Sequence, residues 1–196
     1  MFYTESHKDG RAGYGVTAHW LAGEEDPSLP PPPGAQPVLI DHYGPVDTDP
    51  GSRMWLGAVR ATNNTGELTA MHVALHTAAA HAEAGDAVTI LPDSMMALCT
   101  TTGAWRPTRH KALVARNVRQ LAVLRARDIR VRFRHVRAHR GHHMNERADR
   151  LADLGAQTTA HFRAGRPLRH RDTYQYTSTL PRPQIRPTLP RDHVPD

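Results

Sequence analysis

The chain has 196 residues, 39% of them hydrophobic, which is enough apolar material for one domain of ordinary size with some length to spare. Its formal net charge of +6 favours a polyanionic partner, because each Lys or Arg that meets a phosphate releases condensed counterions. The single cysteine excludes an internal disulfide and a multi-cysteine zinc site. No apolar run approaches the roughly 20 residues of a membrane-spanning helix, and no signal-peptide pattern opens the chain. We therefore expect an intracellular protein that makes no membrane contact.

The first predicted unit is a β-hairpin. Its first strand ends near Glu5, a polar turn with two glycines follows, and residues 14–21 form the second strand. Residues 24–53 are expected to be a proline-rich insertion loop, because an acidic stretch and a run of prolines cannot form regular structure. Residues 38–40 and 54–61 are expected to supply strand material on either side of a second loop.

Helical periodicity begins at Thr65 and ends at Gly85, a residue type that commonly terminates helices. The apolar positions of this helix are Leu68, Met71, Leu75 and Ala78. Residues 87–91 form a compact apolar strand that ends just before Asp93, and a short helix is expected to begin at 94–98.

A second long helix is predicted over 112–125. Its buried side is expected to carry Leu113, Val114, Val118, Leu121 and Leu124. Residues 129–136 alternate between apolar and basic side chains, as in a strand with one face in the core, and the last helix runs over 145–156. Hairpins followed by helical crossovers predict an α/β fold: a mixed five-stranded sheet, with three antiparallel strands and then parallel strands, flanked by helices. The domain covers 1–160, and 161–196 form a basic, proline-rich tail that we expect to be disordered.

Four acidic residues lie where predicted elements begin or end. They are Glu5, Glu67, Asp93 and Asp149. Each has a structural explanation of its own, since Glu67 can interact with a helix dipole, Asp93 can cap a helix, and Asp149 can pair with a neighbouring arginine. As a group they indicate a metal site, because neighbouring strand ends lie about 5 Å apart and clustered carboxylates need cations beside them. Two Mg²⁺ or Mn²⁺ ions would suit phosphodiester cleavage.

The local sequences around these acids resemble the motifs of type 1 ribonucleases H. The matching segments, in the family's order, are YTES with GYG, TNNTGEL at 62–68, Asp93-Ser94, and HRGHHMNERAD at 139–149. They cover roughly residues 1–156. By this resemblance, the fold is ribonuclease H-like and the four acids ligate two Mg²⁺ or Mn²⁺ ions. His139, in the loop before the last helix, would assist product release or proton transfer.

The same resemblance implies an RNA–DNA hybrid as the substrate, with its RNA strand hydrolysed. Asn63 and Asn64 match positions that contact the two strands, and Arg60, Thr62 and Asn117 resemble a pocket for a DNA phosphate. The alternative for Asn63 and Asn64 is a turn that caps the helix. A basic stretch between the two helices, with Trp105 in it, could add to the grip on the hybrid.

The sequence departs from the family pattern at its first acid. The family has Asp followed by Gly, whereas this chain has Glu5 followed by Ser6. The extra methylene moves the carboxylate by more than about 1 Å, and catalytic geometry tolerates such shifts poorly. The alternative to an active nuclease is therefore a catalytically weakened hybrid- or RNA-binding module, or a scaffold within a larger protein. The loops before the TNN motif resemble those of retroelement ribonuclease H domains, which suggests a reverse transcriptase-type polyprotein.

Overall fold

A computed structural model describes residues 2–6, 12–19, 40–137 and 142–163, and its elements confirm the predicted α/β class. The strands are β1 (Phe2–Ser6), β2 (Gly13–Ala18), β3 (Ile40–Pro45), β4 (Ala87–Pro92) and β5 (Arg130–Phe133). The helices are α1 (Asn63–His81), α2 (Met95–Thr102), α3 (Lys111–Ala126) and α4 (His143–Arg163). No helix in the described part of the chain is long and apolar enough to cross a membrane.

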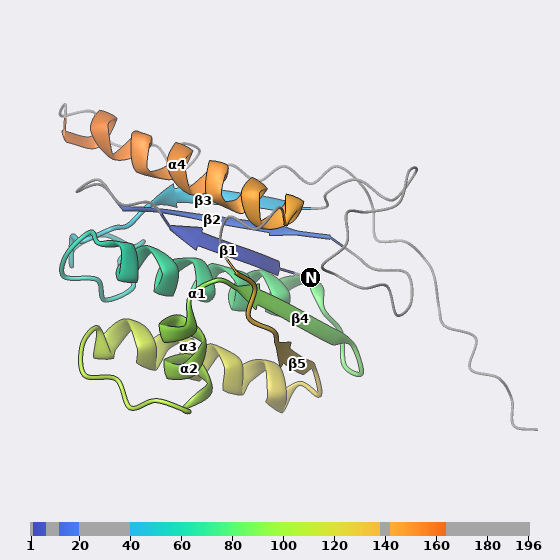
Figure 1. Ribbon diagram of the computed structural model, residues 1–196. Coiled ribbons are helices and arrows are strands. Elements are labelled where there is room, and N and C mark those ends of the chain that lie inside the picture. Colours follow the sequence, from blue (N-terminus) through green and yellow to red (C-terminus); the bar gives the residue numbers. More distant parts are fainter. Residues whose placement is uncertain (1, 7–11, 20–39, 138–141, 164–196) are drawn as a thin grey trace, which may run out of the picture.

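The strands form one sheet in the order β3-β2-β1-β4-β5. β1, β2 and β3 are antiparallel neighbours, whereas β4 runs parallel to β1, and β5 runs parallel to β4. Figure 1 shows α4 on one face of the sheet and α1 on the other, with α2 and α3 packed beyond α1. The parallel half brings the carboxyl ends of β1 and β4 to the same edge, where Glu5 and Asp93 occur in the sequence.

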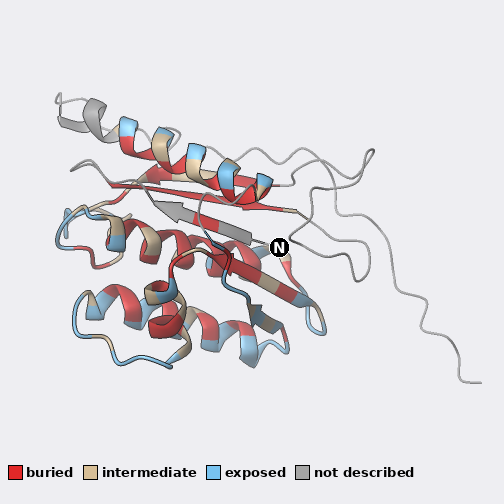
Figure 2. Cartoon of the chain, viewed as in Figure 1, coloured by how far each residue is buried: buried red, intermediate tan, exposed pale blue. Residues whose placement is uncertain are grey.

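Burial follows this layered arrangement. Figure 2 shows buried residues along β2, β4, the sheet-facing side of α1 and the side of α3 that faces α1, with exposed residues on the outer sides of the helices. The residues of α1 that face the sheet are small or apolar. Leu68, Met71 and Leu75 of this helix are fully buried. The alternation predicted for 129–136 is present at its start, since Ile129 is buried and Arg130 is exposed.

Three glycines allow α4 to approach the antiparallel half of the sheet closely. A Cβ on Gly15 would lie 2.6 Å from the backbone nitrogen of Ala152 and 2.9 Å from the Leu151 Cβ. Gly13 faces the next turn of α4, and Gly155 of α4 faces the backbone of Gly44 in β3. Real Cβ atoms do not fit at such separations, so glycine is required by contact rather than by conformation.

The structure differs from three sequence predictions on secondary structure. β3 lies inside the segment 24–53 predicted to be an insertion loop, because residues 40–45 pair with β2. Residues 54–61 are not a strand: Gly57 has a φ of 106°, and the Trp55 indole donates to the Ala58 carbonyl oxygen at 2.8 Å, which closes a compact turn. Of the segment 38–40, only Ile40 is described, as the first residue of β3. α4 continues to Arg163, past the predicted end at 156 and into the segment predicted to be a tail. The rest of that tail, and residues 24–39 of the predicted insertion, lie outside the described residues.

Candidate active site

The start of α1 fixes the position of Glu67. Thr62 is the N-cap, and it forms a capping box with Thr65, in which each side chain accepts from the other residue's backbone N–H. Asn63 is therefore the first helical residue and not the cap. Its side-chain amide donates to Glu67 Oε1 at 2.6 Å, so one carboxylate oxygen is oriented from within the same helix. Glu67 lies beyond the first turn, so it is not a first-turn acid stabilised by the helix dipole.

The other Glu67 oxygen reaches the end of β4. Ser94 caps α2 by accepting from the Ala97 N–H at 3.2 Å, and its hydroxyl donates to Glu67 Oε2. The N-cap of α2 is thus Ser94, which overturns the interpretation of Asp93 as the cap. Because Asp93 directly precedes Ser94, this hydrogen bond brings α1 against the junction that carries Asp93. The backbone oxygen of Asp93 also meets His135 Nε2 at 2.8 Å, which ties the segment after β5 to the same place.

The backbone of Glu5 lies beside this junction. In the parallel pairing of β1 with β4, Thr4 is opposite Pro92, so the next residues along the two strands are Glu5 and Asp93. Neighbouring strands are separated by about 5 Å. In the antiparallel pairing with β2, Glu5 is opposite Gly15. The side chain of Glu5 lies outside the described part of the structure.

Asp149 is carried to this edge by α4. A Cβ on Gly15 would collide with the Ala148 carbonyl oxygen and the Ala152 nitrogen, so the helical turn containing Asp149 passes directly over the residue that pairs with Glu5. A small apolar cluster packs the start of the same helix against β4 and the segment after β5. Its members are Leu91, Val136, Met144 and Ala148. Asp149 itself is half-buried.

An ion pair joins α4 to β3. Arg147 donates from Nε to Asp41 Oδ1 at 3.1 Å and from a terminal nitrogen to Asp41 Oδ2, in a two-pronged contact with β3. The hydrogen bond to Asp41 raises the pKa of Arg147 above its usual value. The sequence interpretation offered Asp149 a neighbouring arginine, either Arg147 or Arg150, as its partner. In the fold Arg147 pairs with Asp41, on a strand far away along the chain.

Among the described residues, the carboxylates do not form a preassembled metal site. No group of three or more His, Cys, Asp or Glu side chains in that part of the chain has a geometry that could hold a metal ion. Glu67, Asp93 and Asp149 are all half-buried. Of the other two predicted catalytic residues, His139 lies outside the described residues, and only the backbone of Glu5 is inside them.

The residues predicted to contact nucleic acid divide into two groups. Arg60, Thr62 and Asn64 are exposed around the start of α1, and Asn63 is half-buried beside them. Asn117 is instead fully buried between α3 and α1, where its Nδ2 donates to the Leu68 carbonyl oxygen at 3.0 Å. The structure does not bring Asn117 to the surface that holds the other four.

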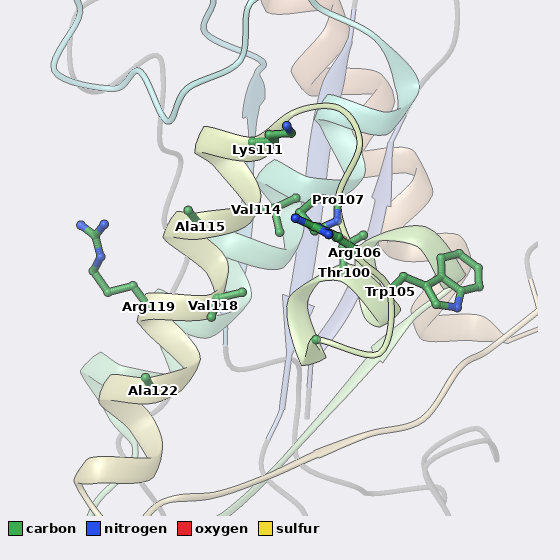
Figure 3. A pocket seen from close by; sticks show the side chains of 11 residues that line it. Thr100, Trp105, Arg106, Pro107, Lys111, Val114, Ala115, Val118, Arg119 and Ala122 are labelled. Atoms are coloured by element: carbon green, nitrogen blue, oxygen red, sulfur yellow. The ribbon is translucent and has the colours of Figure 1, made fainter.

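The basic stretch between α2 and α3 borders an open pocket of about 630 Å³. Figure 3 shows Val114 and Val118 of α3 facing this pocket, with Arg106 and Pro107 across from them and the Trp105 ring directed outward. Trp105 is 51% exposed and Val118 is 44% exposed. The prediction that Val118 belongs to the buried side of α3 is therefore wrong.

Ser94 is the site residue whose role the sequence argument missed. Its signal was present, since a serine directly between an apolar strand and an apolar helical run is a typical N-cap. Its second role, the hydrogen bond to Glu67, had no signal, because the two residues belong to separate elements.

Comparison with known proteins decides the family. The sequence profile of the family described as RNase H matches residues 44–157, more than half of the chain. The chain belongs to the ribonuclease H family. The matched span includes Glu67, Asp93, His139 and Asp149 and leaves out Glu5. A curated relative named Ribonuclease H, from Anaeromyxobacter dehalogenans (strain 2CP-C), is 30% identical over 139 residues, which are 66% of this chain and 73% of that protein.

Solved structures share the fold at low sequence identity. RNase H1 from Halobacterium salinarum NRC-1 has a TM-score of 0.54 and 23% identity, over 80% of this chain and 96% of the other. The N-terminal RNase H domain of a Mycobacterium tuberculosis protein has a TM-score of 0.55 and 22% identity, over 83% and 97%. LC11-RNase H1, solved in complex with an RNA/DNA hybrid, has a TM-score of 0.57 and 17% identity, over 81% and 97%.

Proposed function

We propose that this chain is a metal-dependent endonuclease that hydrolyses the RNA strand of RNA–DNA hybrids by a two-metal mechanism. The observation that carries the proposal is the hydrogen bond from Ser94 to Glu67, which places one acidic residue of the family motif against the strand end that carries the next. Membership of the ribonuclease H family supports the reaction class. A relative with this fold, LC11-RNase H1, has been solved in complex with an RNA/DNA hybrid, which supports the substrate.

The residues present fit hard divalent cations. The candidate ligands Glu5, Glu67, Asp93 and Asp149 are all carboxylates, and oxygen ligands suit Mg²⁺ or Mn²⁺. The two described hydrogen bonds to Glu67 come from Asn63 and Ser94, which are neutral donors and leave the negative charge of the carboxylate in place. When bound, the ions would make a water molecule more acidic and compensate the charge that develops on the leaving oxygen.

The chain's own side chains orient these ligands and receive the substrate. Asn63 and Ser94 fix both oxygens of Glu67, so its carboxylate is positioned before any ligand arrives. The Arg147–Asp41 ion pair and the Gly15 contact hold the turn of α4 that carries Asp149. We assign His139 to proton transfer or product release.

The exposed residues at the start of α1 are the proposed contact surface for the hybrid. A helix N-terminus presents backbone N–H groups and a positive dipole end, both of which favour phosphate. Arg60 and Thr62 would hold a DNA phosphate there, while Asn63 and Asn64 would contact the two strands. We do not include Asn117 in this surface, because it is fully buried.

A cleavage assay on a labelled hybrid tests the proposal. In the presence of Mg²⁺ or Mn²⁺, the wild-type chain should cut the RNA strand and leave 3′-hydroxyl and 5′-phosphate ends. Asp93→Asn removes one carboxylate charge with little change in volume, so it should abolish cutting while the circular dichroism spectrum stays the same. If wild type cleaves no better than Asp93→Asn, the proposed activity is lost.

A second function is favoured by one observation, the presence of Glu5 where the family has Asp. A catalytically weakened hybrid-binding module, on its own or inside a reverse transcriptase-type polyprotein, would bind the hybrid without cutting it. Glu5→Asp distinguishes the two functions. If the wild type is an active enzyme, the variant should cleave at a similar rate. If the wild type is inert and the variant gains cleavage, the binding module is established.

A further inference from the structure

Helix α1 carries a pair of histidines one turn apart, outside the candidate active site. His72 and His76 have the i, i+4 spacing that places two side chains on the same face of a helix. Their rings are stacked, with centroids 6.4 Å apart and planes inclined by 16°. His72 is half-buried and His76 is exposed, so the pair lies at the protein surface.

The buried amide of Asn117 fixes the protonation of His72. Asn117 Nδ2 donates to the Leu68 carbonyl oxygen, which only accepts, so the amide nitrogen must be on that side and Asn117 Oδ1 must face His72. Oδ1 lies 3.2 Å from His72 Nδ1. Since Oδ1 is also only an acceptor, Nδ1 must carry the proton in this contact. In a neutral ring the other nitrogen, Nε2, then has an available lone pair.

The surroundings keep the His72 ring neutral. The pKa of His72 is lowered to about 4, mainly by burial and also by the nearby charges of His76 and Arg116, while the hydrogen bond with Asn117 acts in the opposite direction. Nε2 is therefore an unprotonated nitrogen at neutral pH. It is on the side of the ring away from Asn117.

We propose that His72 and His76 form a binding site for a divalent transition-metal ion of the kind that imidazole prefers, such as Ni²⁺, Cu²⁺ or Zn²⁺. His72 would contribute Nε2, His76 would contribute a ring nitrogen, and water would complete the coordination. Imidazole nitrogens bind such ions, whereas Mg²⁺ and Mn²⁺ prefer the oxygen ligands of the candidate active site. The two sites therefore differ in ligand chemistry as well as in position.

Rotation of the exposed His76 side chain would let both rings reach one ion. Two nitrogens that each bind at about 2.0–2.1 Å can be no more than about 4 Å apart. In the stacked conformation, with centroids 6.4 Å apart, the lone pairs lie in nearly parallel ring planes and do not point at one ion. The exposed His76 side chain would have to rotate to bring a ring nitrogen towards His72 Nε2. Asn117 would act as the hydrogen-bonded partner that orients a ligating histidine, a feature that metal sites commonly have.

The site has two protein ligands and open positions. Within the described residues, no third His, Cys, Asp or Glu completes a metal cluster. Arg116 is close enough to influence His72 electrostatically, and its charge opposes a cation. Both facts weaken the binding of any divalent ion, so we expect detectable binding mainly for Ni²⁺ and Cu²⁺, towards which affinity rises along the divalent series.

Titration of the full chain with Ni²⁺, followed by calorimetry, tests this site. Excess Mg²⁺ occupies the carboxylates, so that the signal reports nitrogen ligands. We expect one binding event of the wild type to weaken by about tenfold or more in His76→Gln and in His72→Gln. The control is His110→Asn, which removes one imidazole elsewhere at a residue with a φ of 52°, a conformation that Asn tolerates. It should titrate like the wild type.

Two outcomes would overturn the inference. One is a His76→Gln titration that superimposes on that of the wild type. The other is an equal loss in His110→Asn. Because His76 is exposed, its replacement leaves the core intact. Zn²⁺ with imidazole ¹⁵N NMR gives a second readout, in which the His72 Nε2 resonance should shift far more than Nδ1. Neither measurement depends on cleavage, so both remain informative if the proposed nuclease activity fails.

Discussion

Gly15→Ala is the substitution for which the structure makes the sharpest prediction. The new Cβ would lie 2.6 Å from the Ala152 nitrogen and 2.9 Å from the Leu151 Cβ, and closer still to the Ala148 carbonyl oxygen. Two of these three atoms are backbone of α4, so no side-chain rotation relieves the collision. The helix must move away from β2, and Asp149 moves with it.

The expected cost is at the upper end of what overpacking produces. Extra methyl groups in packed interiors destabilise by about 1–3 kcal/mol, and contact with backbone favours the upper value, about 3 kcal/mol. For a chain of 150–250 residues each kcal/mol shifts Tm by about 2–4 °C, so a decrease of about 6–12 °C should follow. A displacement of about 1 Å at Asp149 should also lower cleavage by about 100-fold.

Thermal and urea unfolding, followed by circular dichroism, measure the stability, and the hybrid assay measures the rate. Gly51→Ala is the matched control, because its Cβ would meet only the Asp49 side chain at 3.3 Å in an exposed turn. It should change stability by no more than about 0.5 kcal/mol. If Gly15→Ala is as stable as Gly51→Ala, then α4 does not pack on β2 as described, and the placement of the Asp149 turn over Gly15 is refuted.

Three further predictions concern the ligands, the ion pair and pH. Ser94→Ala should destabilise the fold by about 1 kcal/mol, because the N-cap of α2 is lost. It should also raise the Mg²⁺ concentration needed for half-maximal cleavage, because Glu67 loses an orienting donor. An unchanged metal titration would contradict this role. Arg147→Ala should destabilise by about 2 kcal/mol in urea unfolding, because it leaves the buried Asp41 carboxylate without its ion-pair partner, and Arg147→Ala combined with Asp41→Ala should recover part of that loss. The free energy of unfolding should fall as pH drops from about 6.5 towards 4. Three histidines have an ordinary pKa of 6.5 in the unfolded chain and a pKa of about 4 in the folded chain. In this pH range the unfolded chain therefore binds protons that the folded chain does not. The histidines concerned are His19, His42 and His72, and burial is the largest cause for each. Urea titrations at several pH values that give one flat line would rule out this linkage.

Hydrophobic periodicity predicted the long elements well. The helices expected over 112–125 and 145–156 are α3 and α4, and the apolar run at 87–91 is β4. These elements bury a continuous stripe or face, and the local spacing of their apolar residues indicates which side is buried. The prediction of strand at 54–61 failed because the segment is apolar without alternation and turns at Gly57.

The position of Asn117 in the helical period predicts burial, although the residue was assigned to a phosphate contact. It lies four residues after Leu113 and four before Leu121, so the helical period places it on the buried side of α3. The family resemblance instead suggested contact with a phosphate. The structure buries Asn117 and exposes Val118, because the face of α3 that meets α1 is centred on Leu113, Asn117 and Leu121. The amide is tolerated there because it bonds both the Leu68 carbonyl oxygen and His72.

By itself, the sequence determined the family, the order of most strands and helices, and the acidic residues of the motif, since these depend on local composition and spacing. The tertiary structure alone decided which side chains meet: Ser94 with Glu67, Arg147 with Asp41, and the backbone of α4 with Gly15. The physical reason is that such contacts join residues from separate elements. Their partners are fixed by how helices and strands pack in three dimensions, which no local period encodes.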